Sequence, residues 1–311
     1  MSWLPVALAA YFILAIVNLL DKFLVDNIIK SSRAYAFAAC FLGAVVVVVA
    51  PWFLVWPGWY LFSHNIVNGF IFAGALWSLY AALRQGEASR ILVLVGGITP
   101  IITLILSLIF FQEQFSAREW LGISLMFLGV FVIAFLPVSR SYLSRVLSSL
   151  KLKQVMLPGG TLMAAISALA YAIYFISTKE AYAGQVFFSA FIWTRIGAAL
   201  AVMLFLLRKA DRAAIKKLFN SSNRGKSQFL LISNQTLGAT GFILQNYAVY
   251  LGSVVIVNAL QGIQYAFLLV ISAFLSVLAP KLLREVFSWR ILIQKAVAVS
   301  AIIAGLYFIA V

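Results

Sequence analysis

Charged residues are scarce in this sequence, and acidic residues are the scarcest of them. Only 10% of the 311 residues are charged, whereas 64% are hydrophobic. A soluble domain carries roughly 25% charged residues, so this chain could not cover a water-exposed surface with polar groups. The composition therefore excludes an ordinary soluble protein and indicates that a lipid bilayer is the main solvent.

Cysteine and histidine are nearly absent. Cys40 is the only cysteine and His64 is the only histidine. A single cysteine excludes an internal disulfide and a cysteine-based metal site. We place His64 in a loop, where it would not serve as the base of a serine triad or as part of a histidine metal site. We expect no enzymatic activity, no metal and no cofactor.

Long apolar runs are what the sequence has in abundance. They extend over about 20 residues, the length that crosses a hydrocarbon core of about 30 Å. In hydrocarbon every backbone N–H and C=O group needs an internal partner, so spans are helices or closed barrels, and these unbroken runs lack the alternation of barrel strands. The sequence predicts an all-α integral membrane protein with about ten transmembrane helices. The expected helices cover residues 3–20, 34–55, 65–83, 91–111, 118–136, 159–178, 185–207, 228–250, 254–278 and 287–310.

Basic residues lie mainly on one side of the expected membrane. The net charge is +15, and most lysines and arginines follow the first, third, fifth, seventh and ninth expected helices. The positive-inside rule places these loops in the cytoplasm and both termini outside it. Topology explains the charge better than a nucleic-acid partner does, so we expect none. We expect a multi-pass protein of a bacterial inner membrane.

Two basic connections are expected to be amphipathic helices. In residues 138–158, Tyr142, Leu143 and Leu147 share a helical face with other apolar residues, and in residues 208–226 Ala214 and Ile215 do the same. Such helices lie on an anionic lipid leaflet, so membrane lipids are expected partners. A plain solvated linker is the alternative in each case.

The two halves of the chain share polar landmarks in the same order. The matched segments are Asp21-Lys22 with Thr178-Lys179-Glu180, Gly43-Ala44 with Gly197-Ala198, and Glu113–Arg118 with Glu285–Arg290. Each half holds an odd number of helices, which inverts the second half relative to the first, as in many transporters. The sequence predicts two inverted five-helix repeats at 1–137 and 159–311, joined by a basic amphipathic linker at 138–158. Chance similarity between apolar segments is the alternative.

A known family resembles this pattern. Gly86-Glu87-Ala88-Ser89-Arg90 leads through Gly97-Ile98-Thr99-Pro100 to Glu113, and then to Gly122 and Gly129. This order is similar to the EamA-type repeat of the drug/metabolite transporter superfamily, which has a proline in its fourth helix, a glutamate at the following turn and glycines along its fifth helix.

The resemblance is weaker in the second copy, where Phe267 stands in place of the proline and Gln294 in place of the first glycine. It implies a ten-helix exporter or exchanger of amino acids, nucleotide-linked sugars or other metabolites. Many members of the family place both termini in the cytoplasm, which the charge distribution here opposes.

Polar residues inside the expected spans recur at helical spacing. Such residues are costly in hydrocarbon and face a cavity or another helix. We predict that they line a central cavity for a small polar solute; hydrogen bonding between helices is the alternative. The predicted lining residues are Asn18, Lys22, Trp77, Tyr80, Tyr171, Tyr174, Arg195, Asn246, Asn258, Gln261 and Tyr265.

Arg195 is the most informative of these residues, because it lies near the middle of the seventh expected helix among apolar neighbours. An arginine there costs several kcal/mol, on the order of 3 or more, unless it is paired or hydrated. Its planar guanidinium could hold a carboxylate or phosphate of the solute. Alternatively it could bind helix carbonyls or reach towards Glu180. For Lys22 and Lys179, near helix ends, we expect snorkelling to the interface.

Gly96, Gly97 and Pro100 in the fourth expected helix, with Gly262 in the ninth, are the predicted bending points for a rocking motion of the two halves. Asp21 is expected at the end of the first helix, and no other acidic residue is expected well inside a span. Uniport or exchange of a zwitterion or anion is therefore expected, rather than proton-driven export. A flippase for a lipid or lipid-linked sugar and a non-transporting scaffold are the rival functions. The sequence leaves the oligomeric state, a homodimer included, open.

Overall fold

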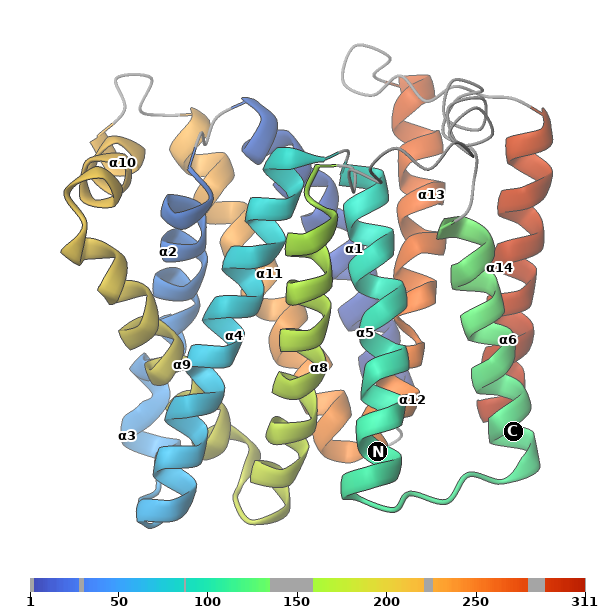
Figure 1. Ribbon diagram of the computed structural model, residues 1–311, viewed down its shortest axis with the longest axis horizontal. Helices are drawn as coiled ribbons and strands as arrows, with labels where there is room; N and C mark the ends of the chain where they lie inside the picture. The colour runs from blue at the N-terminus through green and yellow to red at the C-terminus, as the bar shows by residue number, and fades with distance from the viewer. Residues whose placement is uncertain are drawn as a thin grey trace, which may run out of the picture.

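A computed structural model describes residues 3–27, 31–86, 88–134, 159–220, 226–278 and 289–310. Long helices lie side by side across the molecule (Figure 1). The helices of the first part are α1 Trp3–Asn27, α2 Ser32–Gly43, the 3-10 helix η1 Ala44–Val49, α3 Ala50–Phe53, α4 Trp59–Gln85, α5 Ala88–Phe110 and α6 Ala117–Ala134. Those of the second part are α8 Thr161–Ala183, α9 Phe187–Met203, the 3-10 helix η2 Leu204–Leu207, α10 Lys209–Asn220, α11 Lys226–Leu251, α12 Val254–Ala259, α13 Gln261–Leu278 and α14 Trp289–Ala310.

The expected all-α integral membrane fold is confirmed. Within the described chain, residues 3–21, 32–53, 59–85, 161–183 and 187–207 are long and apolar enough to cross a bilayer, and α5, α12 with α13, and α14 contain shorter apolar stretches. α11 is less apolar because it carries the buried residues Asn234, Gln235, Gln245 and Asn246. In hydrocarbon such residues are tolerated only where they face other helices or a cavity.

The helices of the two halves pack against each other in related pairs. α1 packs along α11 and α8 packs along α4; α5 contacts α8 and α13 contacts α1; α6 packs along α14. Such matched pairs are expected for two inverted five-helix repeats. A contact between two helices of different halves then recurs between their equivalents in the other repeat. The exact domain boundaries stay a prediction, since the linker at 138–158 lies outside the described residues.

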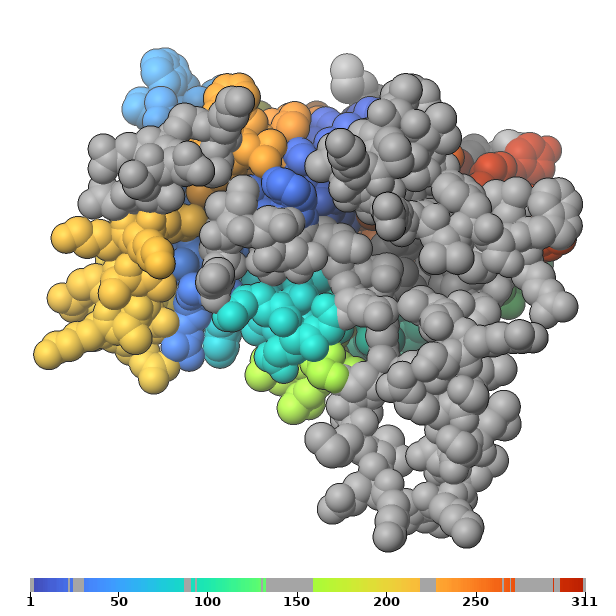
Figure 2. Space-filling model, turned by 90° about the horizontal axis from the view of Figure 1, so that it is seen from above, coloured from blue at the N-terminus to red at the C-terminus, as the bar shows by residue number. Residues whose placement is uncertain are grey.

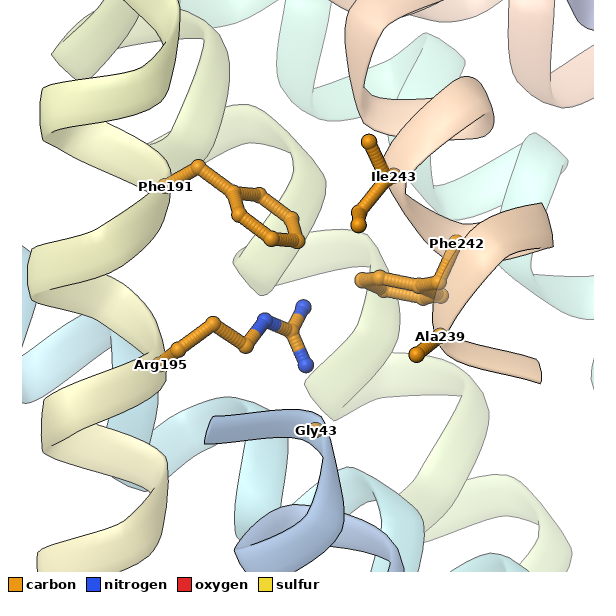
Figure 3. Close-up of a pocket in the computed structure, with 6 residues that line it drawn as sticks. All are labelled: Gly43, Phe191, Arg195, Ala239, Phe242 and Ile243. Carbon is orange, nitrogen blue, oxygen red and sulfur yellow. The ribbon is translucent and has the colours of Figure 1, made fainter. Parts of the chain in front are cut away.

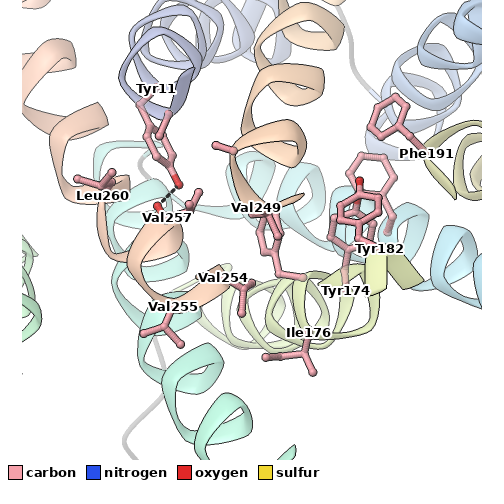
Figure 4. Close-up of a cluster of buried hydrophobic side chains, with 14 of the residues drawn as sticks. Tyr11, Tyr174, Ile176, Tyr182, Phe191, Val249, Val254, Val255, Val257 and Leu260 are labelled. Carbon is pink, nitrogen blue, oxygen red and sulfur yellow. Dashed lines mark hydrogen bonds between the residues drawn. The ribbon is translucent and has the colours of Figure 1, made fainter. Parts of the chain in front are cut away.

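Helix α12 is tied into the core by the first helix. The Tyr11 hydroxyl of α1 donates a hydrogen bond to the Val257 carbonyl at 2.6 Å, and Gln245 Nε2 of α11 donates to the same hydroxyl at 3.3 Å (Figure 4). Val254, Val255 and Val257 are themselves fully buried. A short helix of six residues is therefore held by side chains from both halves of the chain.

The predicted bending points lie in two different settings. α5 is one continuous helix through Gly96, Gly97 and Pro100. The ninth expected helix, by contrast, is broken at Leu260 into α12 and α13, two residues before Gly262. A proline removes only one backbone donor, and the helix tolerates that loss where its neighbours hold it in place.

His64 lies in a helix, which corrects the expected loop position. α4 begins at Trp59, directly after Gly58, whose φ of 84° turns the chain. His64 Nε2 lies 3.0 Å from the Ser177 carbonyl oxygen and 2.8 Å from its Oγ, so the ring joins α4 to α8. The imidazole is thus part of the helix packing.

α10 confirms the expected helix between the seventh and eighth spans and lies on the flank of the bundle (Figures 1 and 2). Ile215 is buried, whereas Lys216 and Lys217 are exposed. Asp211 of α10 pairs with Arg33 of α2 at 3.0 Å, which holds the helix against the bundle. The chain termini lie at the opposite end of the molecule from α10 (Figure 1).

Glycines allow α4 and α9 to approach closely. A Cβ atom at Gly69 would lie 2.5 Å from the Ala198 backbone nitrogen, and one at Gly197 would lie 2.5 Å from the Ile66 carbonyl oxygen. Only glycine fits at such a contact, because the opposing atoms belong to helix backbone and cannot turn away. This contact joins the two halves next to the site described below.

We expect Gly69→Ala to lower the thermal unfolding midpoint, because the methyl group forces α4 and α9 apart at a cost of about 1–3 kcal/mol. Gly74→Ala in the same helix is the matched control, since nothing lies within 4 Å of a Cβ there. It should leave the midpoint unchanged or raise it, because alanine favours helix over glycine. Equal loss of stability in both variants would show that the close approach is not what Gly69 provides.

Candidate solute-binding site

Arg195 lies in the interior between the two halves of the chain. It projects from α9, which packs against α4 and α2 of the first half, and its side chain is only 4% exposed. No described carboxylate lies within ion-pair distance of its guanidinium; the described ion pair is that of Arg33 with Asp211. The site is therefore built around a buried positive charge without a described acidic partner.

Aromatic rings surround this charge. The guanidinium carbon lies 4.0 Å from the ring centre of Phe72 in α4, 4.6 Å from that of Phe242 in α11 and 4.7 Å from that of Phe191 in α9. Each such contact contributes about 0.5–2 kcal/mol when desolvated. Removing an ion from water costs several kcal/mol, so the rings offset the burial of Arg195 only in part.

Hydrogen bonds lead from Arg195 to an asparagine. Arg195 Nη2 donates to the Tyr174 hydroxyl at 3.3 Å, and that hydroxyl donates to Asn246 Oδ1 at 2.9 Å. The Tyr182 hydroxyl donates to the same oxygen at 3.3 Å, and Asn246 Nδ2 donates to the Phe242 carbonyl at 2.9 Å. Asn246 is thereby fully engaged and fixes the position of Tyr174.

The guanidinium retains unused donors. It carries five N–H groups, and a single long bond to Tyr174 is its described hydrogen bond. Its Nε is buried without a partner. Glu180, a partner considered from the sequence, is exposed and accepts a hydrogen bond from Tyr60 at 3.3 Å instead. Chemically, the free N–H groups suit a carboxylate or phosphate.

A small cavity opens beside the guanidinium (Figure 3). Its volume is about 20 Å³, and it is lined by Gly43 at the end of α2, by Phe191 and Arg195 of α9, and by Ala239, Phe242 and Ile243 of α11. A water molecule needs roughly 10–15 Å³, so this space holds about one water and no metabolite. The cavity lies between α2 of the first half and α9 and α11 of the second.

Three of the predicted lining residues come together here: Tyr174, Arg195 and Asn246. Tyr171, one turn before Tyr174 in α8, is half-buried and packs its ring 6.3 Å from that of Phe72, so it belongs to the same wall. Helices α4, α8, α9 and α11 thus contribute to one polar and aromatic cluster between the two halves.

Other predicted lining residues lie elsewhere. The guanidinium of Arg33, which pairs with Asp211 of α10, lies 5.3 Å from the ring centre of Trp77. Tyr80 packs against Tyr35 with ring centres 4.4 Å apart. Asn18 is half-buried on α1. For Lys22 of α1 and Tyr265 of α13, the side chains lie outside the described part of the structure.

Asn258 and Gln261 form a second cluster of polar side chains, at the break between α12 and α13. Asn258 is fully buried, and both its amide nitrogen and its amide oxygen lack a described partner. Gln261 Oε1 is likewise buried and unpartnered. Unpaired buried amides are costly, so this break is a position where a polar ligand or water would be stabilised.

Two charged residues that were expected near helix ends have described partners. Lys179 Nζ donates to the Val249 carbonyl at 3.0 Å and to the Gly252 carbonyl at 2.7 Å, and so caps the end of α11. These carbonyls lie at the negative end of a helix dipole, which favours a cation. The expected snorkelling of Lys179 to the interface stays a prediction.

Asp21 is not at the end of the first helix, because α1 continues to Asn27. Its carboxylate is 8% exposed and accepts hydrogen bonds from the Tyr35 hydroxyl and from Asn234 Nδ2. The apolar span of α1 nevertheless ends at Asp21, as expected from the sequence. The burial of its carboxylate, to which α2 and α11 supply hydrogen-bond donors, was not foreseen.

The aromatic residues around Arg195 were missed from the sequence. Phe72, Phe191 and Phe242 carry no polar group and are indistinguishable in the sequence from the other phenylalanines, of which the chain has 26 in all. One signal was available: Phe191 precedes Arg195 by four residues and therefore shares its helix face. Phe72 and Phe242 lie on other helices, so only the folded structure shows that their rings reach Arg195.

We expect Tyr174→Phe to lower the free energy of unfolding by about 1–2 kcal/mol, because it leaves the guanidinium and Asn246 without their common partner. The thermal unfolding midpoint of the purified protein measures this loss. Tyr307→Phe, on an exposed part of α14, is the matched control and should change nothing. An unchanged midpoint in both variants would contradict the role of the Tyr174 hydroxyl.

Comparison with known proteins supports the fold and the family. A solved structure described as "Crystal structure of protein" matches with a TM-score of 0.64 and 14% identity, covering 99% of this chain and 96% of the other. At that identity the match shows a common fold. No curated protein matches the chain. The model of the EamA-like transporter family matches residues 1–135. Residues 1–135 of this multi-pass membrane protein are therefore similar to the EamA-like transporter family, in agreement with the resemblance noted in the sequence.

Proposed function

We propose that this protein is a secondary transporter, an exporter or exchanger, of a small polar metabolite that is anionic or amino-acid-like. The observation that carries the proposal is Arg195, a buried guanidinium between the two halves with unused hydrogen-bond donors and no described acidic partner. A carboxylate or phosphate of the solute would supply the missing negative charge and accept those donors.

The surroundings of Arg195 suit a transported solute. Phe72, Phe191 and Phe242 give apolar walls, and Tyr174 and Asn246 give hydrogen-bonding groups. Binding sites of small molecules commonly combine a mostly apolar lining with a few fixed polar groups. The aromatic rings that now stack on the guanidinium would turn towards the solute when the site opens.

The position of the site supports a mechanism of alternating access. Its residues come from α2 and α4 in the first half and from α8, α9 and α11 in the second. Rocking one half against the other would open the cavity of about 20 Å³ towards one side of the membrane at a time. The break at Leu260 and the change from α2 to η1 at Ala44 supply positions where the helices can bend.

The membrane placement is part of the proposal. The exposed basic residues Arg208, Lys209, Lys216 and Lys217 lie on and next to α10, at the end of the molecule opposite both termini. Basic amphipathic helices bind anionic lipid surfaces. We place this end at the cytoplasmic leaflet of a bacterial inner membrane and both termini outside the cytoplasm.

Counterflow in liposomes tests the transport function. Purified protein is reconstituted with pooled unlabelled amino acids, sugar phosphates and nucleotides inside, and labelled members are offered one at a time. We expect saturable accumulation of an anionic or zwitterionic solute. Arg195→Gln should reduce it at least tenfold, because a charge-assisted pair of about 1.5–3 kcal/mol or more is lost.

Arg208→Gln is the matched control, since Arg208 is exposed at the end of η2 and outside the site. Its accumulation should equal that of the wild type. Accumulation that survives Arg195→Gln unchanged would contradict the anchor role. No accumulation of any polar solute by folded protein would favour the lipid flippase or the scaffold instead.

Cysteine labelling in intact cells tests the orientation. Cys40 is buried, so the background from the native thiol is low. We expect a membrane-impermeant thiol reagent to label Ser2→Cys from outside, because the charge distribution places the termini there. Lys216→Cys on the exposed face of α10 should react only after the cells are permeabilised. The reverse pattern would show that both termini are cytoplasmic.

A further inference from the structure

A second buried charge lies apart from the guanidinium site. Asp21 of α1 is 8% exposed, and the described side chains place no lysine, arginine or histidine in contact with it. Arg33, at the start of the neighbouring helix α2, pairs with Asp211 instead. A carboxylate desolvated without a cation is unfavourable unless hydrogen bonds or a bound cation compensate it.

The two described hydrogen bonds to this carboxylate end on the same oxygen. The Tyr35 hydroxyl and Asn234 Nδ2 both donate to Asp21 Oδ1. Asn234 is fully buried, and its own Oδ1 has no described partner. A proton on the second carboxylate oxygen, Oδ2, would neutralise Asp21 without displacing either donor, and the resulting O–H group could donate a hydrogen bond to a nearby acceptor.

The groups facing Asp21 are otherwise neutral. Tyr80 of α4 adjoins the carboxylate and stacks against Tyr35, and Gln235 of α11 adjoins the Tyr35 hydroxyl. Tyr171 of α8 lies within electrostatic range of both Asp21 and Arg195. These side chains can hydrogen-bond to the carboxylate or to its protonated form, but they supply no positive charge. A proton is the smallest cation that neutralises the group without needing further oxygen ligands.

The donors come from different halves of the chain. Tyr35 belongs to α2 in the first half and Asn234 to α11 in the second, while Asp21 itself lies on α1. Hydrogen bonds to an ionised carboxylate are roughly twice as strong as those to a neutral group. The ionised form therefore holds the halves together, and protonation weakens that attachment.

We propose that Asp21 is a proton-binding site whose protonation is coupled to the rocking of the two halves; the coupling rests on the transport function proposed above. A hydronium ion gives its proton to Oδ2 and leaves as water, so the carboxylate becomes a neutral carboxylic acid. On the other side of the cycle, water takes the proton back as hydronium. No electron transfer and no other bond change is involved. The proton neutralises Asp21 just as an anionic solute neutralises Arg195.

Infrared spectroscopy tests the site without any transport. The pH-difference spectrum of the purified protein should show the C=O band of a protonated, water-shielded carboxyl group. Asp21→Asn should remove that band, while Glu180→Gln, at an exposed carboxyl, should keep it. In Tyr35→Phe the band should persist at a shifted frequency, because the group loses a hydrogen bond. A band unchanged by Asp21→Asn, or no band at all, overturns the proton site.

Transport measured with and without a pH gradient tests the coupling. We expect the wild-type flux to change at least severalfold with the gradient, and the ratio of the two fluxes to fall to about one in Asp21→Asn and to stay at the wild-type value in Glu180→Gln. Counterflow that ignores the gradient in the wild type refutes the coupling and leaves the transporter intact. Absence of counterflow refutes the transport function and the coupling, whereas the infrared band alone decides the proton site.

Discussion

A positive charge buried without a described acidic partner is the constraint on which the centre of this molecule depends. The guanidinium of Arg195 must be compensated inside a bundle that has little water, and it draws groups from several helices to do so. Phe72, Phe242 and Tyr174 come from α4, α11 and α8, and all of them reach the same side chain. These side chains stabilise the guanidinium less than hydration or an ion pair would, and this leaves the site receptive to an anion.

The bilayer imposes the same constraint on every other polar group in the interior. Asn246 and Asp21 meet it with partners from neighbouring helices, whereas Asn258 and Gln261 do not meet it among the described residues. Such polar groups can stay without protein partners where the two halves meet, because apolar packing alone does not hold that surface together. The close glycine contact between α4 and α9 shows how tightly this surface packs beside the buried charge.

The positions of the two buried charges have a consequence for mechanism. Arg195 lies against α2, α4 and α11, and Asp21 binds donors from α2 and α11, so the same two helices contact both. Movement of α2 relative to α11 would therefore change the environment of the cation and of the carboxylate together. Equilibria at two sites are coupled when both bias one element that has two arrangements.

The sequence was sufficient for the fold class, and it pointed to three of the residues that meet at the buried charge. Apolar run length and composition predicted a helical membrane protein, and the order from Gly86 to Gly129 indicated the family. Arg195, Tyr174 and Asn246 could be chosen because polar residues in apolar spans are conspicuous.

The remaining features depend on packing between distant segments. Asp21 seemed terminal to its helix because hydropathy falls there, whereas α1 continues to Asn27 and the carboxylate is buried beside donors from α2 and α11. The phenylalanines around Arg195 could not be distinguished from other core aromatics. The break at Leu260 has no proline or glycine at the residue itself, and the proline that is present, Pro100, lies in an uninterrupted helix.

Ligand-induced thermal stabilisation is the measurement that tests the central claim most directly. Folded wild-type protein and Arg195→Gln would be heated with each of a set of carboxylates, amino acids, phosphates and matched neutral analogues. A ligand that binds only the folded state raises the midpoint in proportion to its affinity. The account predicts that an anionic or zwitterionic solute stabilises the wild type and that neither its neutral analogue nor the Arg195→Gln protein shows the effect. Equal stabilisation of both proteins by the same solute would contradict it.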